Sequence, residues 1–108
     1  LGKSIRRYIE KHLAETLTPE GLAETFRVSR SQIYRIFAPY DGVARYIWER
    51  RMLRSLKMLT QPHSLHLTIS AIAFECGYTS EAHFSRSFKA RFGHPPSYMR
   101  AEVSILTA

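Results

Sequence analysis

The strongest constraint on this chain is an internal repeat with an offset of about fifty residues. The segment from Leu17 to Gly42 recurs, with one residue added, as the segment from Leu67 to Gly93. Each copy holds two short stretches with apolar residues at helical spacing, separated by a turn, which is the plan of a helix-turn-helix unit. Neither copy is large enough to bury a good core alone, so each is expected to need flanking helices. The matching positions are Thr18 and Thr68, Ala23 and Ala73, Ser29 and Ser80, Arg35 and Arg86, and Phe37 and Phe88.

Apolar periodicity predicts an all-α protein with seven helices and no strand, because no segment sustains the period-two alternation of a strand. Two helix starts are marked clearly. Thr18 is a hydroxyl N-cap followed by proline and a carboxylate, and Ser29 with Gln32 forms a capping box. In the last helix, Tyr98 and Met99 are expected to face the core. The expected helices cover residues 5–13, 18–26, 30–38, 44–60, 68–76 and 81–92, with a short last one starting near 96.

The repeat divides the chain into two helix-turn-helix subdomains joined by a long central helix. The first subdomain is expected at 1–42, with its second helix, the recognition helix of such units, at about 30–38. The joining helix is expected at 43–61. The second subdomain is expected at 62–108, with its recognition helix at about 81–92.

Charge indicates the kind of partner. The 108 residues carry 16 Lys and Arg against 9 Asp and Glu, a formal net charge of +7. This excess favours a polyanionic partner, which is nucleic acid or less often an anionic membrane. No apolar run approaches the roughly 18 residues of a membrane span, which excludes an integral membrane protein. Composition alone does not choose between the two polyanions, and the partner expected here is DNA rather than a membrane. The single cysteine, Cys76, fits a reducing compartment and a buried, inert thiol.

Catalytic and metal chemistry find little support in the sequence. There are no paired carboxylates, no glycine-rich phosphate loop and no order of residues typical of a nucleophilic triad. His63 and His66 are three residues apart, yet they lie in a polar break with no cysteine or carboxylate nearby. We therefore expect no enzyme, no metal site and no cofactor.

The second repeat and the long helix carry a motif set that resembles the DNA-binding domain of the AraC/XylS family of bacterial transcription regulators. The resemblance covers essentially the whole chain. The residues that carry it are Ile72–Tyr78, Ser80, His83–Lys89, Arg91–Gly93, Pro96 and Arg100, together with Tyr46, Ile47, Arg51, Met52, Ser55 and Leu59 of the long helix.

The resemblance implies sequence-specific binding of double-stranded DNA in transcription regulation, most often as an activator. It implies that each unit places its second helix in the major groove and that the joining helix sets their spacing. It further implies RNA polymerase as a partner, a sensor or dimerisation domain on a longer chain, and a bacterial cytoplasmic location. The chain departs from the family pattern at Ala38–Asp41, which ends the first recognition helix early, and at Cys76 and Met99.

Helical periodicity and the family positions select nearly the same outward-facing residues on the two recognition helices. Arginine can donate two hydrogen bonds to guanine, so Arg35 and Arg86 are the strongest candidates for reading bases. The ring of Tyr34 is expected to contact a thymine methyl group, or else to be a surface aromatic. The candidates for base contact are Ser31, Tyr34, Arg35, Ala82, His83, Ser85 and Arg86, and those for phosphate contact are Thr18, Arg30, Thr68, Lys89 and Arg91.

Several residues have a simpler structural interpretation. Gln32 is expected to serve the capping box rather than DNA, and Glu81 to stabilise a helix N-terminus. Arg50, Arg51 and Arg54 are expected to form a solvated face or ion pairs on the joining helix. Two other functions stay open beside specific DNA binding: a non-specific architectural nucleic-acid binder, and a helical protein-interaction module.

Overall fold

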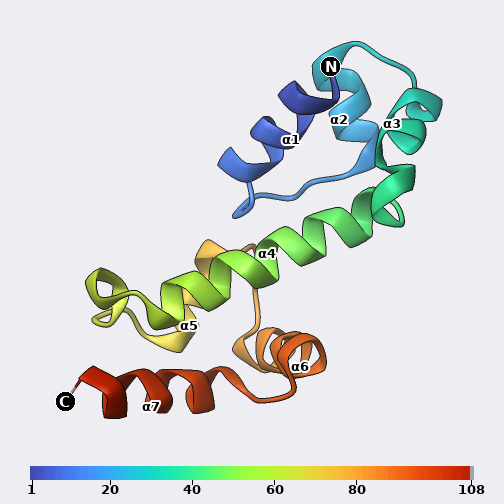
Figure 1. The fold of residues 1–108 in the computed structure, drawn as a ribbon. Helices are drawn as coiled ribbons and strands as arrows, with labels where there is room; N and C mark the ends of the chain where they lie inside the picture. The colour runs from blue at the N-terminus through green and yellow to red at the C-terminus, as the bar shows by residue number, and fades with distance from the viewer. Residues whose placement is uncertain (108) are drawn as a thin grey trace. The chain divides into compact units, whose positions relative to one another are not determined.

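A computed structural model describes residues 1–107 of the chain and the side chains up to residue 103. All regular structure in this range is helical, and its seven α-helices confirm the predicted all-α fold. Among these helices, none combines the length and apolar character that crossing a bilayer requires. The helices are α1 (Gly2–Lys11), α2 (Pro19–Phe26), α3 (Arg30–Phe37), α4 (Val43–Thr60), α5 (Ile69–Glu75), α6 (Glu81–Phe92) and α7 (Pro96–Thr107), with 3₁₀ turns at Ala38–Tyr40 and Pro62–Ser64 (Figure 1).

The chain divides into two compact units, Leu1–Arg50 and Arg51–Ala108. The boundary falls inside α4, which runs without interruption through 18 residues. Each unit contains one pair of helices from the repeat, α2 with α3 in the first and α5 with α6 in the second. The helices that flank each pair supply the additional core that the repeat alone lacks.

In the first unit, α1 covers the helix pair with a stripe of buried aliphatic residues. Ile5, Ile9 and Leu13 are completely buried, as their spacing predicts. From α3, Ile33 and Phe37 are completely buried against them. The side chains that complete this core are Leu22, Ala23, Val43 and Ile47.

In the second unit, aromatic rings of α6 form the centre of the core. Phe84 and Phe88 are completely buried with ring centroids 5.9 Å apart, and Phe92 lies 4.6 Å from Phe88. Cys76 is also buried, and its burial raises the pKa of the thiol to about 11. The thiol therefore stays protonated at neutral pH and behaves as an apolar side chain, as expected.

The helix starts lie where the hydroxyl residues predict them. Ser29 Oγ accepts a hydrogen bond from the backbone N–H of Gln32 at 3.1 Å, and Gln32 Oε1 accepts one from the N–H of Ser29 at 3.2 Å. This reciprocal capping box confirms the structural role predicted for Gln32. The side chains of Thr18, Thr68 and Ser80 cap α2, α5 and α6 more simply, each by accepting one backbone N–H from the first turn.

Replacement of Ser29 by alanine is expected to destabilise the first unit by about 0.5–2 kcal/mol, because the N–H of Gln32 loses its acceptor at the start of α3. Denaturant unfolding of the full chain measures the change. Thr25→Ala is the control, since it removes an exposed hydroxyl from α2 without touching a cap. Equal destabilisation by both variants would contradict the role of the capping box.

The last helix differs from the prediction. It is not short but runs to Thr107, and Tyr98 is 44% exposed instead of facing the core. The ring of Tyr98 stacks on His94 at 4.2 Å. Pro96 and Arg100 anchor this helix instead: Pro96 is completely buried, and Arg100 donates hydrogen bonds to the backbone carbonyls of Leu59, Leu65 and Leu67.

Candidate nucleic-acid interface

The first candidate surface is the exposed face of α3. The turn between α2 and α3 closes at Arg27, whose backbone is left-handed (φ 55°), and Val28 N–H bonds back to Ala23 at 3.0 Å. Because Ile33 and Phe37 bury the opposite face, periodicity turns other side chains of α3 to solvent. The structure leaves Arg30, Ser31, Tyr34 and Arg35 exposed.

Arg30, Tyr34 and Glu20 form a connected polar group on this surface. One terminal nitrogen of Arg30, Nη2, donates to the Tyr34 hydroxyl at 3.4 Å and lies 3.5 Å from a Glu20 carboxylate oxygen. The guanidinium carbon is 5.9 Å from the centre of the Tyr34 ring. The hydrogen bond to Tyr34, with the nearby Glu20 carboxylate, raises the pKa of Arg30. The sequence places the Glu20 carboxylate in the first turn of α2 but does not predict its pairing with Arg30, because Arg30 lies on the next helix.

The N-terminal end of α1 reaches the same helix. A shallow hollow of about 250 Å³ is lined by Leu1, Gln32, Arg35 and Ile36. Leu1, one of the residues that line this hollow, is 57% exposed. No pattern in the sequence predicts this neighbour of Arg35, because it depends on how α1 packs against α3.

The early end of the first recognition helix is stabilised by aromatic packing. After the 3₁₀ turn, Asp41 and Gly42 adopt left-handed backbone conformations (φ 63° and 100°). The ring centroid of Tyr46 lies 4.9 Å from that of Tyr40 and 5.0 Å from that of Phe37. The chain thus turns directly from α3 into α4 instead of extending the recognition helix.

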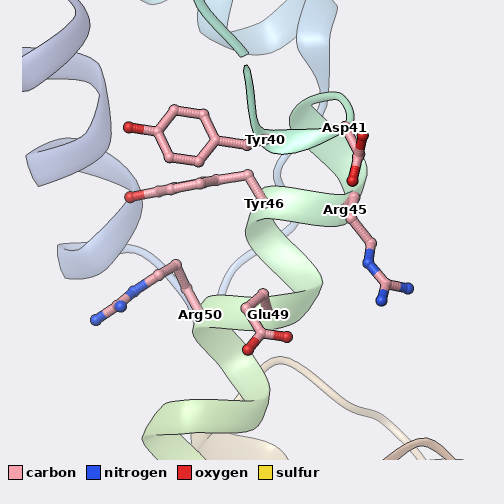
Figure 2. A pocket seen from close by; sticks show the side chains of 6 residues that line it. All are labelled: Tyr40, Asp41, Arg45, Tyr46, Glu49 and Arg50. Carbon is pink, nitrogen blue, oxygen red and sulfur yellow. The ribbon is translucent and has the colours of Figure 1, made fainter. Parts of the chain in front are cut away.

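A second hollow of about 330 Å³ opens beside this turn. Figure 2 shows the Tyr40 and Tyr46 rings one above the other, with Arg50 pointing to the same side, whereas Arg45 points the other way. Arg50 donates to the Glu10 carboxylate of α1, and this hydrogen bond raises the pKa of Arg50. The ion pair confirms one of the two structural roles expected for Arg50.

Two other arginines of α4 are packed or partly buried rather than fully solvated. The guanidinium of Arg45 lies 4.4 Å from the centre of the Trp48 ring. Arg51 is half-buried, and its burial lowers the pKa of the guanidinium. These observations favour structural roles for Arg45 and Arg51.

The second candidate surface is the exposed face of α6. Ser80 caps this helix, and the buried Phe84 and Phe88 set its orientation. The ring of His83 meets the edge of Tyr78 at 5.1 Å, which holds the imidazole near the start of the helix. The predicted residues Ala82, His83, Arg86, Lys89 and Arg91 are exposed, and Ser85 is half-buried.

The predicted phosphate-contact residues lie at or near the helix starts and on the exposed faces. Thr18 Oγ1 and Thr68 Oγ1 each accept a hydrogen bond from a backbone N–H at 3.0 Å. Each hydroxyl therefore keeps its own proton to donate. Arg91 lies with its guanidinium 4.8 Å from the centre of the Phe92 ring, at the far end of α6 from Ser80. Each unit thus carries some of the candidates: Thr18 and Arg30 lie in the first, and Thr68, Lys89 and Arg91 in the second.

Comparison with known proteins identifies the family of this chain. A family model described as a helix-turn-helix domain matches residues 22–102. The transcriptional regulator CdhR of Pseudomonas aeruginosa is 33% identical over 99 residues, which cover 90% of this chain and 29% of that protein. The chain thus spans about a third of the length of the curated relatives that it matches.

Solved structures show the same fold. The C-terminal domain of the response regulator AraT from Geobacillus stearothermophilus has a TM-score of 0.81 and 30% identity, over 94% of this chain and 84% of that one. A regulator from Chromobacterium violaceum described as AraC-type has a TM-score of 0.78 and 30% identity, over 92% of this chain and 88% of that one. The chain belongs to the AraC-type helix-turn-helix family of transcriptional regulators.

Proposed function

We propose that this chain binds double-stranded DNA sequence-specifically in transcription regulation, with α3 and α6 in successive major-groove segments. The observation that carries the proposal is the repeated exposed arginine. Arg35 and Arg86 are exposed at equivalent positions of helices whose opposite faces are completely buried. A helix presented in this way fits the major groove, and successive segments on one side of the duplex lie about 34 Å apart.

Base reading is assigned to the exposed side chains of the two helices. Arg35 and Arg86 each pair with the O6 and N7 acceptors of a guanine. Tyr34, Ser31, His83 and Ser85 supply further polar contacts, and Ala82 contacts a thymine methyl group. These assignments follow from position on the helix and from chemistry.

Positioning on the duplex is assigned to contacts that do not depend on sequence. Backbone N–H groups at the helix starts at Thr18 and Thr68 donate to phosphate oxygens. The guanidinium groups of Arg30 and Arg91 and the ammonium of Lys89 donate to them as well. Together with the net charge of +7, they supply the electrostatic part of the affinity.

A wider regulatory role is part of the same proposal. The chain spans about a third of the length of its curated relatives. We therefore propose that it works together with a sensor or dimerisation domain on a longer chain, as the family resemblance implies. We further propose that the protein acts in the bacterial cytoplasm and contacts RNA polymerase to activate transcription. In vitro transcription from a promoter that carries the selected site, with and without the protein, tests this activation.

The decisive experiment separates base reading from charge. A preferred duplex is first selected from a random pool, and Arg35→Ala, Arg86→Ala and Lys89→Ala are then measured on that duplex and on random DNA at one salt concentration. Each arginine variant is expected to cost about 1–3 kcal/mol on the preferred duplex and to relax the preference at one base position. The two positions are expected about one DNA turn apart.

Lys89→Ala is the matched control for lost positive charge, since it is expected to weaken both DNAs about equally. Equal losses on both DNAs for the two arginine variants would favour a non-specific architectural binder. Absence of binding to any duplex at low salt would favour a protein-interaction module.

A further inference from the structure

The Tyr34 hydroxyl on the exposed face of α3 already has a hydrogen-bond partner within the protein. Arg30, one helical turn earlier, donates to it at 3.4 Å, and Tyr34 remains 47% exposed. The guanidinium is in turn held 3.5 Å from Glu20 on α2. A charged group from another helix therefore orients the donor that engages Tyr34.

This contact determines which hydrogen-bonding role Tyr34 offers to a ligand. Guanidinium has only donors, so its partner must act as the acceptor. A tyrosine hydroxyl has one proton, and the bond from Arg30 engages its oxygen as an acceptor. The O–H proton is therefore the stronger hydrogen-bonding group that Tyr34 offers to a ligand in front of α3.

Resting on the proposed function, we propose that Arg30 is a positioning residue that presents the Tyr34 hydroxyl as a hydrogen-bond donor, so that Tyr34 selects a base with a major-groove acceptor. Such acceptors are N7 of either purine, O6 of guanine and O4 of thymine. Cytosine offers only the N4 donor at its major-groove edge, so it is the base that this arrangement rejects.

The positioning role is compatible with the phosphate contact proposed for Arg30. A guanidinium has five N–H donors, and the contacts with Tyr34 and Glu20 both use Nη2. Donors on Nε and Nη1 are left to reach a phosphate oxygen. Arg30 can therefore bridge the DNA backbone and the residue that reads the base.

The test begins with selection of preferred duplexes by the wild type and by Tyr34→Phe. The position at which Tyr34→Phe loses base preference identifies the base that Tyr34 reads. At that position we expect a base other than cytosine on the contacted strand. Acceptors are then removed one at a time, with 7-deazapurine for N7, 2-aminopurine for O6 and 5-methyl-2-pyrimidinone for O4.

Removal of the contacted acceptor is expected to weaken wild-type binding about 2- to 10-fold, the value of one net hydrogen bond. Tyr34→Phe is expected to bind the modified and unmodified duplexes equally, since it has no hydroxyl. This difference distinguishes a hydrogen bond from a contact between the tyrosine ring and a thymine methyl group, which the phenylalanine variant would retain.

The role of Arg30 is tested by Arg30→Gln against Arg27→Gln. Both remove one exposed positive charge from the same unit, but the structure gives only Arg30 a bond to Tyr34. Arg27→Gln is expected to lower affinity evenly and to keep the base profile. Arg30→Gln is expected to lower affinity and also to relax the rejection of cytosine at the Tyr34 position.

The proposal would be overturned by a preference for cytosine at the Tyr34 position, by equal acceptor effects in wild type and Tyr34→Phe, or by identical base profiles for Arg30→Gln and Arg27→Gln. A uniform loss by Tyr34→Phe on all DNAs would also overturn it, while leaving the reading by Arg35 and Arg86 intact. Failure of the wild type to select any sequence would instead defeat the proposed function itself.

Discussion

Binding to DNA is expected to weaken by roughly three orders of magnitude or more when the salt concentration rises from about 50 to about 200 mM. The physical reason is counterion release: each phosphate that the protein neutralises frees condensed cations, and this gain shrinks as bulk salt increases. The net charge of +7 and basic side chains exposed in both units predict about six to eight phosphate contacts. Fluorescence titration of a labelled duplex over a series of salt concentrations measures the slope.

A single charge provides the control for this slope. Lys89→Gln is expected to reduce the slope of log affinity against log salt by about one, as the loss of one phosphate contact requires. A nearly flat salt profile for the wild type would count against any nucleic-acid function. A steep profile that Lys89→Gln leaves unchanged would remove Lys89 from the phosphate contacts.

Replacement of Phe88 by alanine is expected to destabilise the second unit by about 3–5 kcal/mol, because a large ring leaves a cavity in a closely packed core. Phe88 is completely buried and lies between Phe84 and Phe92, with ring centroids 5.9 and 4.6 Å away. Such a loss is comparable with the whole stability of a small domain. Denaturant unfolding followed by circular dichroism measures it.

The same substitution at Phe74 is the matched control. Phe74 belongs to the same unit but is 63% exposed, so Phe74→Ala is expected to change stability by less than about 0.5 kcal/mol. A loss below about 1 kcal/mol for Phe88→Ala would mean that the orientation of α6, and with it the outward direction of Arg86, is wrong.

Much of the fold could be predicted because its signals are local. The hydroxyl of Ser29 and the amide of Gln32 are three residues apart, and both bonds of the capping box form between them. The burial of Ile33 and Phe88 follows from spacing along a single helix. The same spacing predicts that Arg35 and other candidate side chains of the recognition helices face solvent, and Arg35 is exposed.

Tyr98 shows where this reasoning fails. Apolar spacing placed its ring in the core, yet the ring lies at the surface against His94. Aromatic side chains are amphipathic, so periodicity cannot distinguish a buried ring from one that stacks on a neighbour. The anchors of α7 are Pro96 and Arg100, and the acceptors of Arg100 lie 33 to 41 residues away in the sequence.

By itself, the sequence determined the two helix-turn-helix units, their caps, and which side of each recognition helix faces solvent. These features depend on residues within one or two helical turns of each other, where distances follow from helix geometry. Only the tertiary structure decided the partners of the exposed side chains: Glu20 beside Arg30, Leu1 beside Arg35, and Glu10 with Arg50. These pairs join separate helices, and a pattern along one helix specifies a direction but not the neighbour that packing places there.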